Sequence, residues 1–404
     1  MKKTSIVLAA AILTQPALAS DPFTEALTSG KVYADFRLRY EGVQQDNALE
    51  DANALTLRSR LGYTTADFNG WSAMIEFEDS RPVLGVDDFS VPPTGFNTTG
   101  GVPEYSVIAD PATTELDQGY LRYESDQVDL KGGRQVIVLD NARFVGDVGW
   151  RQDRQTFDGL RAGFAPITNM ELTYAYIAQR NRIFAQAKNV DSSDHLLNGS
   201  YNTAFGKAVA YGYLLEDEGN PVSNALDTYG LSFKGGTKID RATLLYAAEF
   251  AFQNSKVGAA DNDANYMLLE IGALANGITT KIGYEVLGSD GGTYGFSTPL
   301  ATGHKFNGWA DQFLNTPKEG LADIYISAGG KLGGGKWAVI YHDFAADHST
   351  ATVDDMGSEF DILYARKFGK NYNGGVKYAR YSAGDVAAGK VDTDKLWVWA
   401  GVSF

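Results

Sequence analysis

The fold is decided by the stretch Lys31-Val32-Tyr33-Ala34-Asp35-Phe36-Arg37-Leu38-Arg39-Tyr40-Glu41-Gly42. Its even positions are apolar or small, and most of its odd positions are charged. This period of two predicts a β-strand with one apolar face and one charged face. The pattern returns along the chain, notably at 55–63, 71–77, 242–252, 278–286 and 396–404.

The connections between these segments alternate in length. Short connections rich in Gly and Asn, which suit tight turns, are expected at 67–70, 124–127, 165–168, 205–207, 235–240, 276–277, 333–335 and 369–371. Longer polar connections are expected at 80–114, 139–153, 183–190, 288–319 and 345–356. This alternation predicts an all-β, transmembrane antiparallel β-barrel of 18 strands with short periplasmic turns and long external loops. The alternative is a soluble sandwich with one solvated face.

Composition agrees with an exported barrel. The chain of 404 residues has no cysteine and a formal net charge of −15, which excludes a disulfide scaffold and argues against a nucleic-acid partner. Residues 1–19 have the pattern of a signal peptide, with Lys2 and Lys3, an apolar stretch and a small-x-small site ending at Ala19. No later run is apolar enough for a transmembrane helix. We expect a single barrel domain at 20–404 in the bacterial outer membrane.

Aromatic residues gather at the short-turn ends, as expected for a periplasmic girdle at the lipid–water boundary of a barrel that outer-membrane lipid and lipopolysaccharide surround. They are Phe68, Trp71, Phe164, Phe205, Phe368, Tyr372 and Phe404. The terminal stretch 397–404 also resembles the C-terminal strand that the bacterial barrel-assembly machinery reads, with Phe404 as its last residue. This resemblance implies that machinery as a partner.

No motif supports catalysis, a cofactor or a metal. The four histidines accompany no Gly-x-Ser-x-Gly motif, and the glycine-rich stretch 329–336 lacks the spacing of a phosphate-binding loop. The acids at 261–265 resemble the start of a calcium loop, but its glycine and its final glutamate are missing. We therefore expect a protein that is not an enzyme, with no cofactor.

Inward-facing charges are the candidate site. Arg37, Arg39, Arg58 and Arg60 lie on the charged parity of two neighbouring strands and predict an arginine ladder in the lumen. The ladder is extended in this interpretation by Arg122, Arg134 and Arg161, with Glu41, Glu76 and Glu78 on neighbouring inward positions. Opposed charges create a transverse field that selects charged or dipolar solutes. The alternative is that they only pair with one another.

Two segments resemble the alginate-export family of outer-membrane barrels. They are 131–161, beginning Lys-Gly-Gly-Arg-Gln, and 303–317, beginning Gly-His-Lys-Phe-Asn-Gly-Trp. The resemblance implies a monomeric 18-stranded barrel whose loops fold over or into the lumen, with an arginine-rich constriction. The positions that match such a role are Arg37, Arg39, Arg58, Arg60, Arg122, Arg134, Arg143, Arg151 and Arg154. The acidic balance of the chain fits an uptake porin for small anions or oligosaccharides as well as alginate export.

The expected loop at 288–319 carries three aromatic residues, Phe306, Trp309 and Phe313, beside Lys305. These rings are expected to pack inside the mouth or to stack on a sugar, with packing within the loop as the alternative. We expect the loops at 80–114 and 288–319 to narrow the mouth of a passive channel for anionic or hydroxylated solutes, with uronate chains such as alginate as one candidate cargo. The alternative is a non-conducting structural or adhesion barrel that is plugged by its loops.

Overall fold

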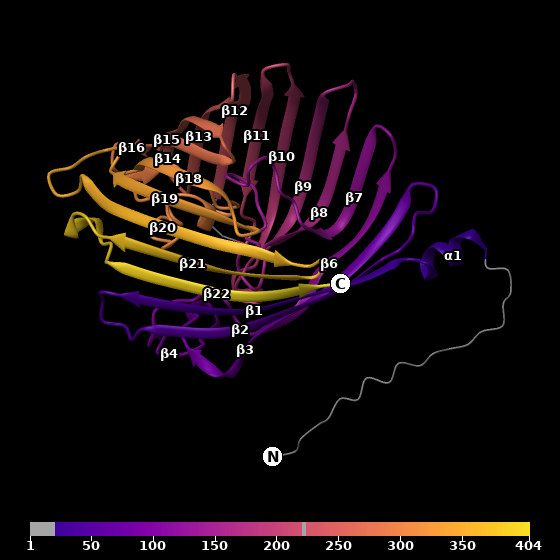
Figure 1. The fold of residues 1–404 in the computed structure, drawn as a ribbon, viewed down its shortest axis with the longest axis horizontal. Coiled ribbons are helices and arrows are strands. Elements are labelled where there is room, and N and C mark those ends of the chain that lie inside the picture. Colours follow the sequence, from indigo (N-terminus) through magenta and orange to yellow (C-terminus); the bar gives the residue numbers. More distant parts are fainter. Residues whose placement is uncertain (1–20, 220–223) are drawn as a thin grey trace, which may run out of the picture.

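The computed structural model describes residues 21–219 and 224–404, and most of them belong to one antiparallel sheet of 18 strands. Each strand of this sheet pairs with its neighbour in the chain, and β1 also pairs with β22 through matches such as Phe36 with Val402. The sheet therefore closes on itself. Figure 1 shows the result, with the indigo β1 lying beside the yellow β22. The expected barrel and its strand number are confirmed.

The strands have the following bounds. On the N-terminal side the barrel contains β1 (Lys31–Gln45), β2 (Ala52–Thr64), β3 (Trp71–Asp88), β6 (Thr113–Glu124), β7 (Val128–Gln135), β8 (Thr156–Phe164), β9 (Met170–Asn181), β10 (Val190–Asn202) and β11 (Gly206–Glu216). It continues with β12 (Asn224–Ile239), β13 (Ala242–Val257), β14 (Ala260–Ala275), β15 (Ile278–Leu287), β18 (Leu321–Leu332), β19 (Gly335–Ala345), β20 (Asp355–Phe368), β21 (Tyr372–Ser382) and β22 (Thr393–Ser403).

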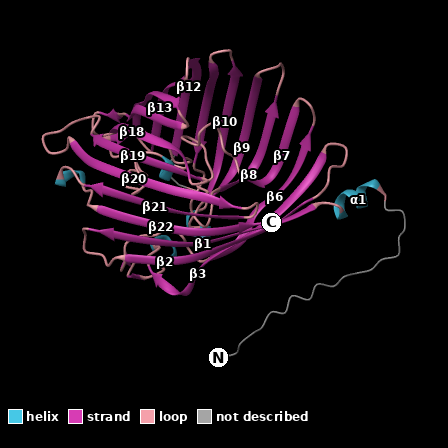
Figure 2. Ribbon diagram, in the orientation of Figure 1, coloured by secondary structure: helices cyan, strands magenta, loops and turns pink. Residues whose placement is uncertain are grey.

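The connections between the strands contain short hairpins and single helical turns. Two short hairpins lie in external loops, β4 (Thr98–Thr99) with β5 (Val102–Pro103) and β16 (Ser289–Asp290) with β17 (Tyr294–Gly295). The helices are α1 (Pro22–Thr28) and the single turns η1 (Pro92–Thr94), η2 (Ala185–Lys188), η3 (Gly303–Lys305) and η4 (Val386–Ala388). Figure 2 shows that α1 lies outside the barrel, at the end where the chain terminates. None of the described helices has the length and apolar character needed to cross a membrane.

Several connections differ from the sequence prediction. β3 extends to Asp88, so the long loop after it spans 89–112 instead of 80–114. The expected turn at 235–240 is wrong, because β12 continues to Ile239 and only Asp240, with φ of 51°, and the next residue make the turn. The external connection between β13 and β14 is also only two residues long. The acids at 261–265 lie within strand β14, and the expected signal segment 1–19 lies outside the described residues.

The two faces of the sheet follow the period of two. Outward side chains such as Leu231 and Ile326 are exposed on the isolated chain, as expected for a surface that lipid covers. The predicted girdle is visible at the short-turn end, where Trp71, Phe205 and Phe404 are exposed. Inward side chains are mostly polar or charged, and many of them are buried. Other parts of the chain must therefore fill some of the lumen and cover these side chains.

Glycine and tyrosine are frequent because tyrosine rings cover glycines on neighbouring strands. A Cβ atom on Gly62 would lie 2.3 Å from the ring of Tyr33, which is its cross-strand partner. A Cβ on Gly283 would lie 2.1 Å from the ring of Tyr325, again its direct partner. A ring lying over a glycine protects the exposed backbone and fixes the register of the strand pair. Some of the 45 glycines therefore make room for a tyrosine ring on the neighbouring strand, whereas others lie in turns.

Candidate functional site

The lumen is occupied by two external loops, 136–155 and 288–320, which fold inward and contact each other. The backbone N–H of Gly146 donates to the carbonyl of Leu300 at 2.8 Å, and the side chain of Gln155 donates to both carbonyls, at 2.8 Å to Gly146 and 3.2 Å to Leu300. Arg182, just beyond β9, donates to the carbonyl of Pro299 at 2.7 Å. The two loops therefore form one body inside the barrel.

The first two arginines of the predicted ladder hold loop 136–155. Arg37 donates to the carbonyls of Gly149 at 3.2 Å and of Trp150 at 2.9 Å. Arg39 is fully buried, donates to the carbonyl of Trp150 and forms an ion pair with Asp110 of loop 89–112. Arg37 lies directly opposite Arg58 across the β1–β2 pair, as the parity predicted. Their guanidinium groups nevertheless have different partners.

Arg151 and Arg154 tie the same loop to acids. Arg151 forms ion pairs with Glu41 of β1 at 3.0 Å and with Asp311 of the second loop at 2.9 Å. Arg154 pairs with Asp117 of β6 and with Glu76 of β3. The carboxylates near Arg151 and Arg154 raise the pKa of both guanidinium groups against the effect of burial. Buried pairs of this kind are costly to break, because one charge is then left without a partner.

The second loop is held by Arg143 and by a buried histidine. Arg143 reaches across from loop 136–155 to Glu285 of β15 at 2.8 Å and to Asn307 at 3.0 Å. His304 stacks on Trp150 with 5.2 Å between ring centroids and an interplanar angle of 5°. Its Nδ1 lies 2.6 Å from Asp311, and its Nε2 lies 2.7 Å from Nζ of Lys377 on β21.

This geometry fixes the protonation of His304. Burial lowers the pKa of the imidazole to about 3, with the ammonium of Lys377 acting in the same direction and Asp311 opposing it. A neutral ring then donates from Nδ1 to Asp311 and accepts at Nε2 from Lys377. Asp311 also pairs with Lys395 of β22 at 2.8 Å. Asp311 is therefore a hub that joins both loops to the barrel wall.

The aromatic residues of loop 288–320 pack inside the mouth, as one of the sequence alternatives expected. Trp309 lies under Nζ of Lys377, 3.8 Å from the ring centroid, and Phe313 packs on Phe344 at 4.6 Å between centroids. Both rings are buried. Phe306 differs, because it is half-buried and lines a cavity together with the exposed Lys305.

The remaining predicted arginines are paired with acids along the barrel wall. Arg58 pairs with Asp35, and Arg60 pairs with Glu78. Arg122 and Arg161 share Asp129, each at 2.7 Å, while Arg134 pairs with Asp158 at 2.7 Å. The side chains of Arg122, Arg134 and Arg161 keep 32%, 21% and 21% of their surface exposed. Arg122 and Arg161, which lie toward the periplasmic ends of β6 and β8, are the partly exposed inward arginines of the predicted set, whereas Arg134 lies at the external end of β7 on the parity of the outward Leu130.

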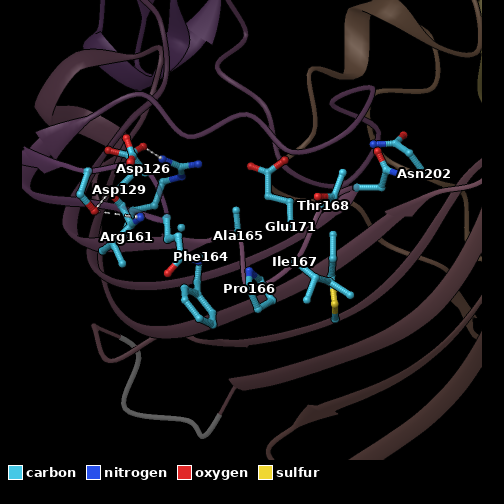
Figure 3. A pocket seen from close by; sticks show the side chains of 16 residues that line it. Asp126, Asp129, Arg161, Phe164, Ala165, Pro166, Ile167, Thr168, Glu171 and Asn202 are labelled. Carbon is cyan, nitrogen blue, oxygen red and sulfur yellow. Dashed lines mark hydrogen bonds and ion pairs between the residues drawn. The ribbon is translucent and has the colours of Figure 1, made fainter.

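Figure 3 shows the hollow at this periplasmic end, where Asp129 and Arg161 lie together and Glu171 stands apart from them. It has a volume of about 680 Å³ and is lined by turns 125–127 and 165–169 and the strand ends beside them. Sequence reasoning missed the acids that organise the interior, namely Asp110, Asp117 and Asp311, and also Trp150 and Lys377. Within the described residues, no group of His and acidic side chains is arranged to hold a metal ion.

The closed barrel, its lipid-facing apolar surface and its charged, loop-lined lumen define the class of an outer-membrane channel protein. Residues 28–289, more than half of the chain, match the alginate export family, and the chain belongs to that family. No curated protein sequence matches it.

Solved structures with a similar fold include proteins of two bacteria. Pseudomonas aeruginosa OccK9 (OpdG) is 14% identical with a TM-score of 0.68, and the match covers 94% of this chain and 100% of that one. Acinetobacter baumannii OccAB4 is 14% identical with a TM-score of 0.69 and coverage of 95% and 100%. P. aeruginosa OccD3 (OpdP) is 12% identical with a TM-score of 0.69 and coverage of 94% and 92%. At these identities the likeness concerns the fold.

Proposed function

We propose that this chain is a passive channel for small anionic or hydroxylated solutes. The observation that carries the proposal is the partly exposed pair of Arg122 and Arg161 on the periplasmic side of the inward-folded loops. Guanidinium groups bind carboxylates through two parallel hydrogen bonds, and the acids beside them accept from hydroxyls. A uronate unit offers both groups, so uronate chains such as alginate remain within the proposed substrate class. Conductance across a planar lipid bilayer tests the channel.

A second candidate, a barrel plugged by its loops, is favoured by one observation. Val145, Leu300 and Trp309 of the two loops belong to the same buried apolar cluster as Trp397 of the barrel wall. Such a cluster crosses part of the lumen and excludes water there. Purified protein that inserts but shows no single-channel steps would support the plugged barrel and contradict the channel.

We expect charge reversal at Arg122 and Arg161 to change the ion selectivity. The double variant Arg122→Glu with Arg161→Glu replaces two positive groups that share Asp129, so the reversal potential in a KCl gradient should move toward cation preference. These residues make no contact with the inward-folded loops among the described hydrogen bonds and ion pairs. Replacing Arg37 instead would also release loop 136–155.

The matched control is Arg81→Glu, because Arg81 is the most exposed arginine among the ion pairs of the barrel and pairs only with Asp79 within its own strand. It should leave the reversal potential close to that of the unmodified protein. An unchanged value in the double variant would remove Arg122 and Arg161 from the selectivity proposal.

A further inference from the structure

A second cavity lies inside the barrel on the wall opposite the arginines. It has a volume of about 510 Å³ and is lined by strands from β11 to β15, by β18 and β19, and by residues of the two inward-folded loops. We call it the lysine cavity because four lysines line it: Lys207, Lys234, Lys281 and Lys305. The first three lie toward the short-turn ends of their strands, so the cavity lies on the periplasmic side of the loops.

The acids that line this cavity already have partners. Glu285 accepts from Arg143 and Tyr266, Asp323 accepts from His342 and Asn307, and Glu270 accepts from Lys281 and Tyr325. Two further carboxylates are also engaged: Glu249 with the hydroxyl of Tyr211, and Asp140 with Asn198 and Lys207. Each of these acids therefore already accepts a hydrogen bond or ion pair from the barrel wall or from the two loops.

Two of the four lysines, Lys234 and Lys305, form no ion pair with a carboxylate of the described residues. Lys305 donates to the carbonyl of Asn141 at 2.8 Å, and across residues 21–219 and 224–404 neither Lys305 nor Lys234 has a carboxylate within 4.0 Å. Partial burial lowers the pKa of Lys305, and the ammonium groups of Lys234 and Lys281 lower it further. Like charges that converge in this way are stabilised by an anion between them.

Apolar groups form the larger part of the remaining lining, beside polar side chains such as Ser232 and Ser327. Phe306 lies at the loop side of the cavity, with its ring centroid 4.8 Å from the guanidinium carbon of Arg143 and 5.5 Å from Nζ of Lys305. Val209, Leu268 and Ile340 line the wall. Ligand sites combine such apolar surface with a few convergent polar groups that fix orientation. An apolar ring placed against Phe306 and these aliphatic groups gains free energy by leaving water, which a hydroxyl-rich ring does not gain there.

We propose that the lysine cavity binds a small monocarboxylate whose body is an apolar ring, with the carboxylate between Lys234 and Lys305 and the ring against Phe306. The inference deepens the proposed function, on which it rests, by assigning a solute-binding site and a narrower class of solute. The lysine cavity is separate from Arg122 and Arg161, so each of the two sites can be tested independently.

Titration calorimetry of the purified, detergent-solubilised barrel with benzoate tests this assignment. The unmodified protein should bind benzoate saturably, and the double variant Lys234→Gln with Lys305→Gln should bind it at least tenfold more weakly, as expected when two charge-assisted hydrogen bonds are lost. Lys318→Gln removes an exposed lysine from the same loop and should leave the affinity unchanged. Unfolded variants are recognised by loss of the β-sheet circular dichroism.

Neutral and hydroxylated probes separate the two parts of the proposal. Benzamide, which lacks the charge, should bind much more weakly than benzoate, and equal binding would overturn the role of the lysines. Glucuronate binding as tight as benzoate would overturn the apolar ring. Protein that conducts KCl but does not bind benzoate would contradict the lysine cavity and leave the channel standing. Protein that binds benzoate but never conducts would contradict the channel alone.

Discussion

Replacing Asp311 by alanine is expected to release loop 288–320 from the barrel wall and to enlarge the pore. The carboxylate of Asp311 contacts His304 at 2.6 Å, Arg151 at 2.9 Å and Lys395 at 2.8 Å. Without this carboxylate the buried cations Arg151 and Lys395 each lose a partner. Breaking a buried ion pair by removing one partner costs about 3–5 kcal/mol. This loss falls on the docked arrangement of the loops, because the strands of the barrel keep their backbone hydrogen bonds.

Single-channel recordings should therefore show a larger unit conductance and more frequent transitions for Asp311→Ala than for the unmodified protein. Asp46→Ala is the matched control, because Asp46 is an exposed acid of an external loop and its side chain makes no ion pair among the described residues. An Asp311→Ala channel with unchanged conductance and unchanged transitions would show that this loop does not limit the pore.

The barrel itself was predictable because its determinants are local. The alternation of 31–42 assigns each side chain to a face, and it placed Arg37 and Arg58 on the same inward face, where they are direct cross-strand partners. Tight turns at 276–277 and 369–371 follow from Asn and Gly at positions that need positive φ. The turn expected at 235–240 failed because two glycines there serve a long strand and not a bend.

The interior contacts were not predictable in the same way. Arg151 and Asp311 are 160 residues apart, and Arg143 and Asn307 are 164 apart, so no local pattern connects them. The sequence indicated that loop 288–320 carries rings too apolar to leave in water, which agrees with the burial of Trp309 and Phe313. It gave no indication that the arginines Arg37 and Arg39 would bind loop carbonyls, because a backbone acceptor carries no side-chain signature.

Acidification is expected to weaken the docking of loop 288–320 through His304. The docked imidazole has a pKa of about 3 because it is buried, whereas an imidazole in water has a pKa of about 6.5. The contribution of His304 to docking is therefore complete above pH 6.5 and declines as the pH falls from 6.5 toward 3, since the released loop gains a proton that the docked loop cannot accept. Two pH units below 6.5 correspond to about 2–3 kcal/mol.

The charged groups that act on His304 come from the two loops and from β21, and they do not reverse this sign. Arg151 and Lys377 are cationic neighbours that oppose a second positive charge. Asp311 raises the pKa of His304 and so acts against the effect of burial on the ring. The pKa of Asp311 itself lies well below its ordinary value, because His304, Lys395 and Arg151 outweigh burial, so its carboxylate stays ionised in this range. Asp153 has the opposite sign, because burial and then Glu115 and Glu78 raise its pKa, and acid favours its docked form. Asp153 belongs to loop 136–155, so a variant at His304 separates the two effects.

His304→Gln keeps a neutral polar side chain that can still donate to Asp311 and accept from Lys377, but it cannot gain a proton. Between pH 7 and 4.5, the unmodified channel should show a growing fraction of the larger conductance state, and His304→Gln should show a much smaller change. His195→Gln, at a histidine of β10 that bonds to Tyr174 and not to either loop, should behave like the unmodified protein. Parallel pH profiles for the unmodified protein and His304→Gln would mean that another group governs the loop, because the buried ring is the group of this hub whose charge in the released loop changes across that range.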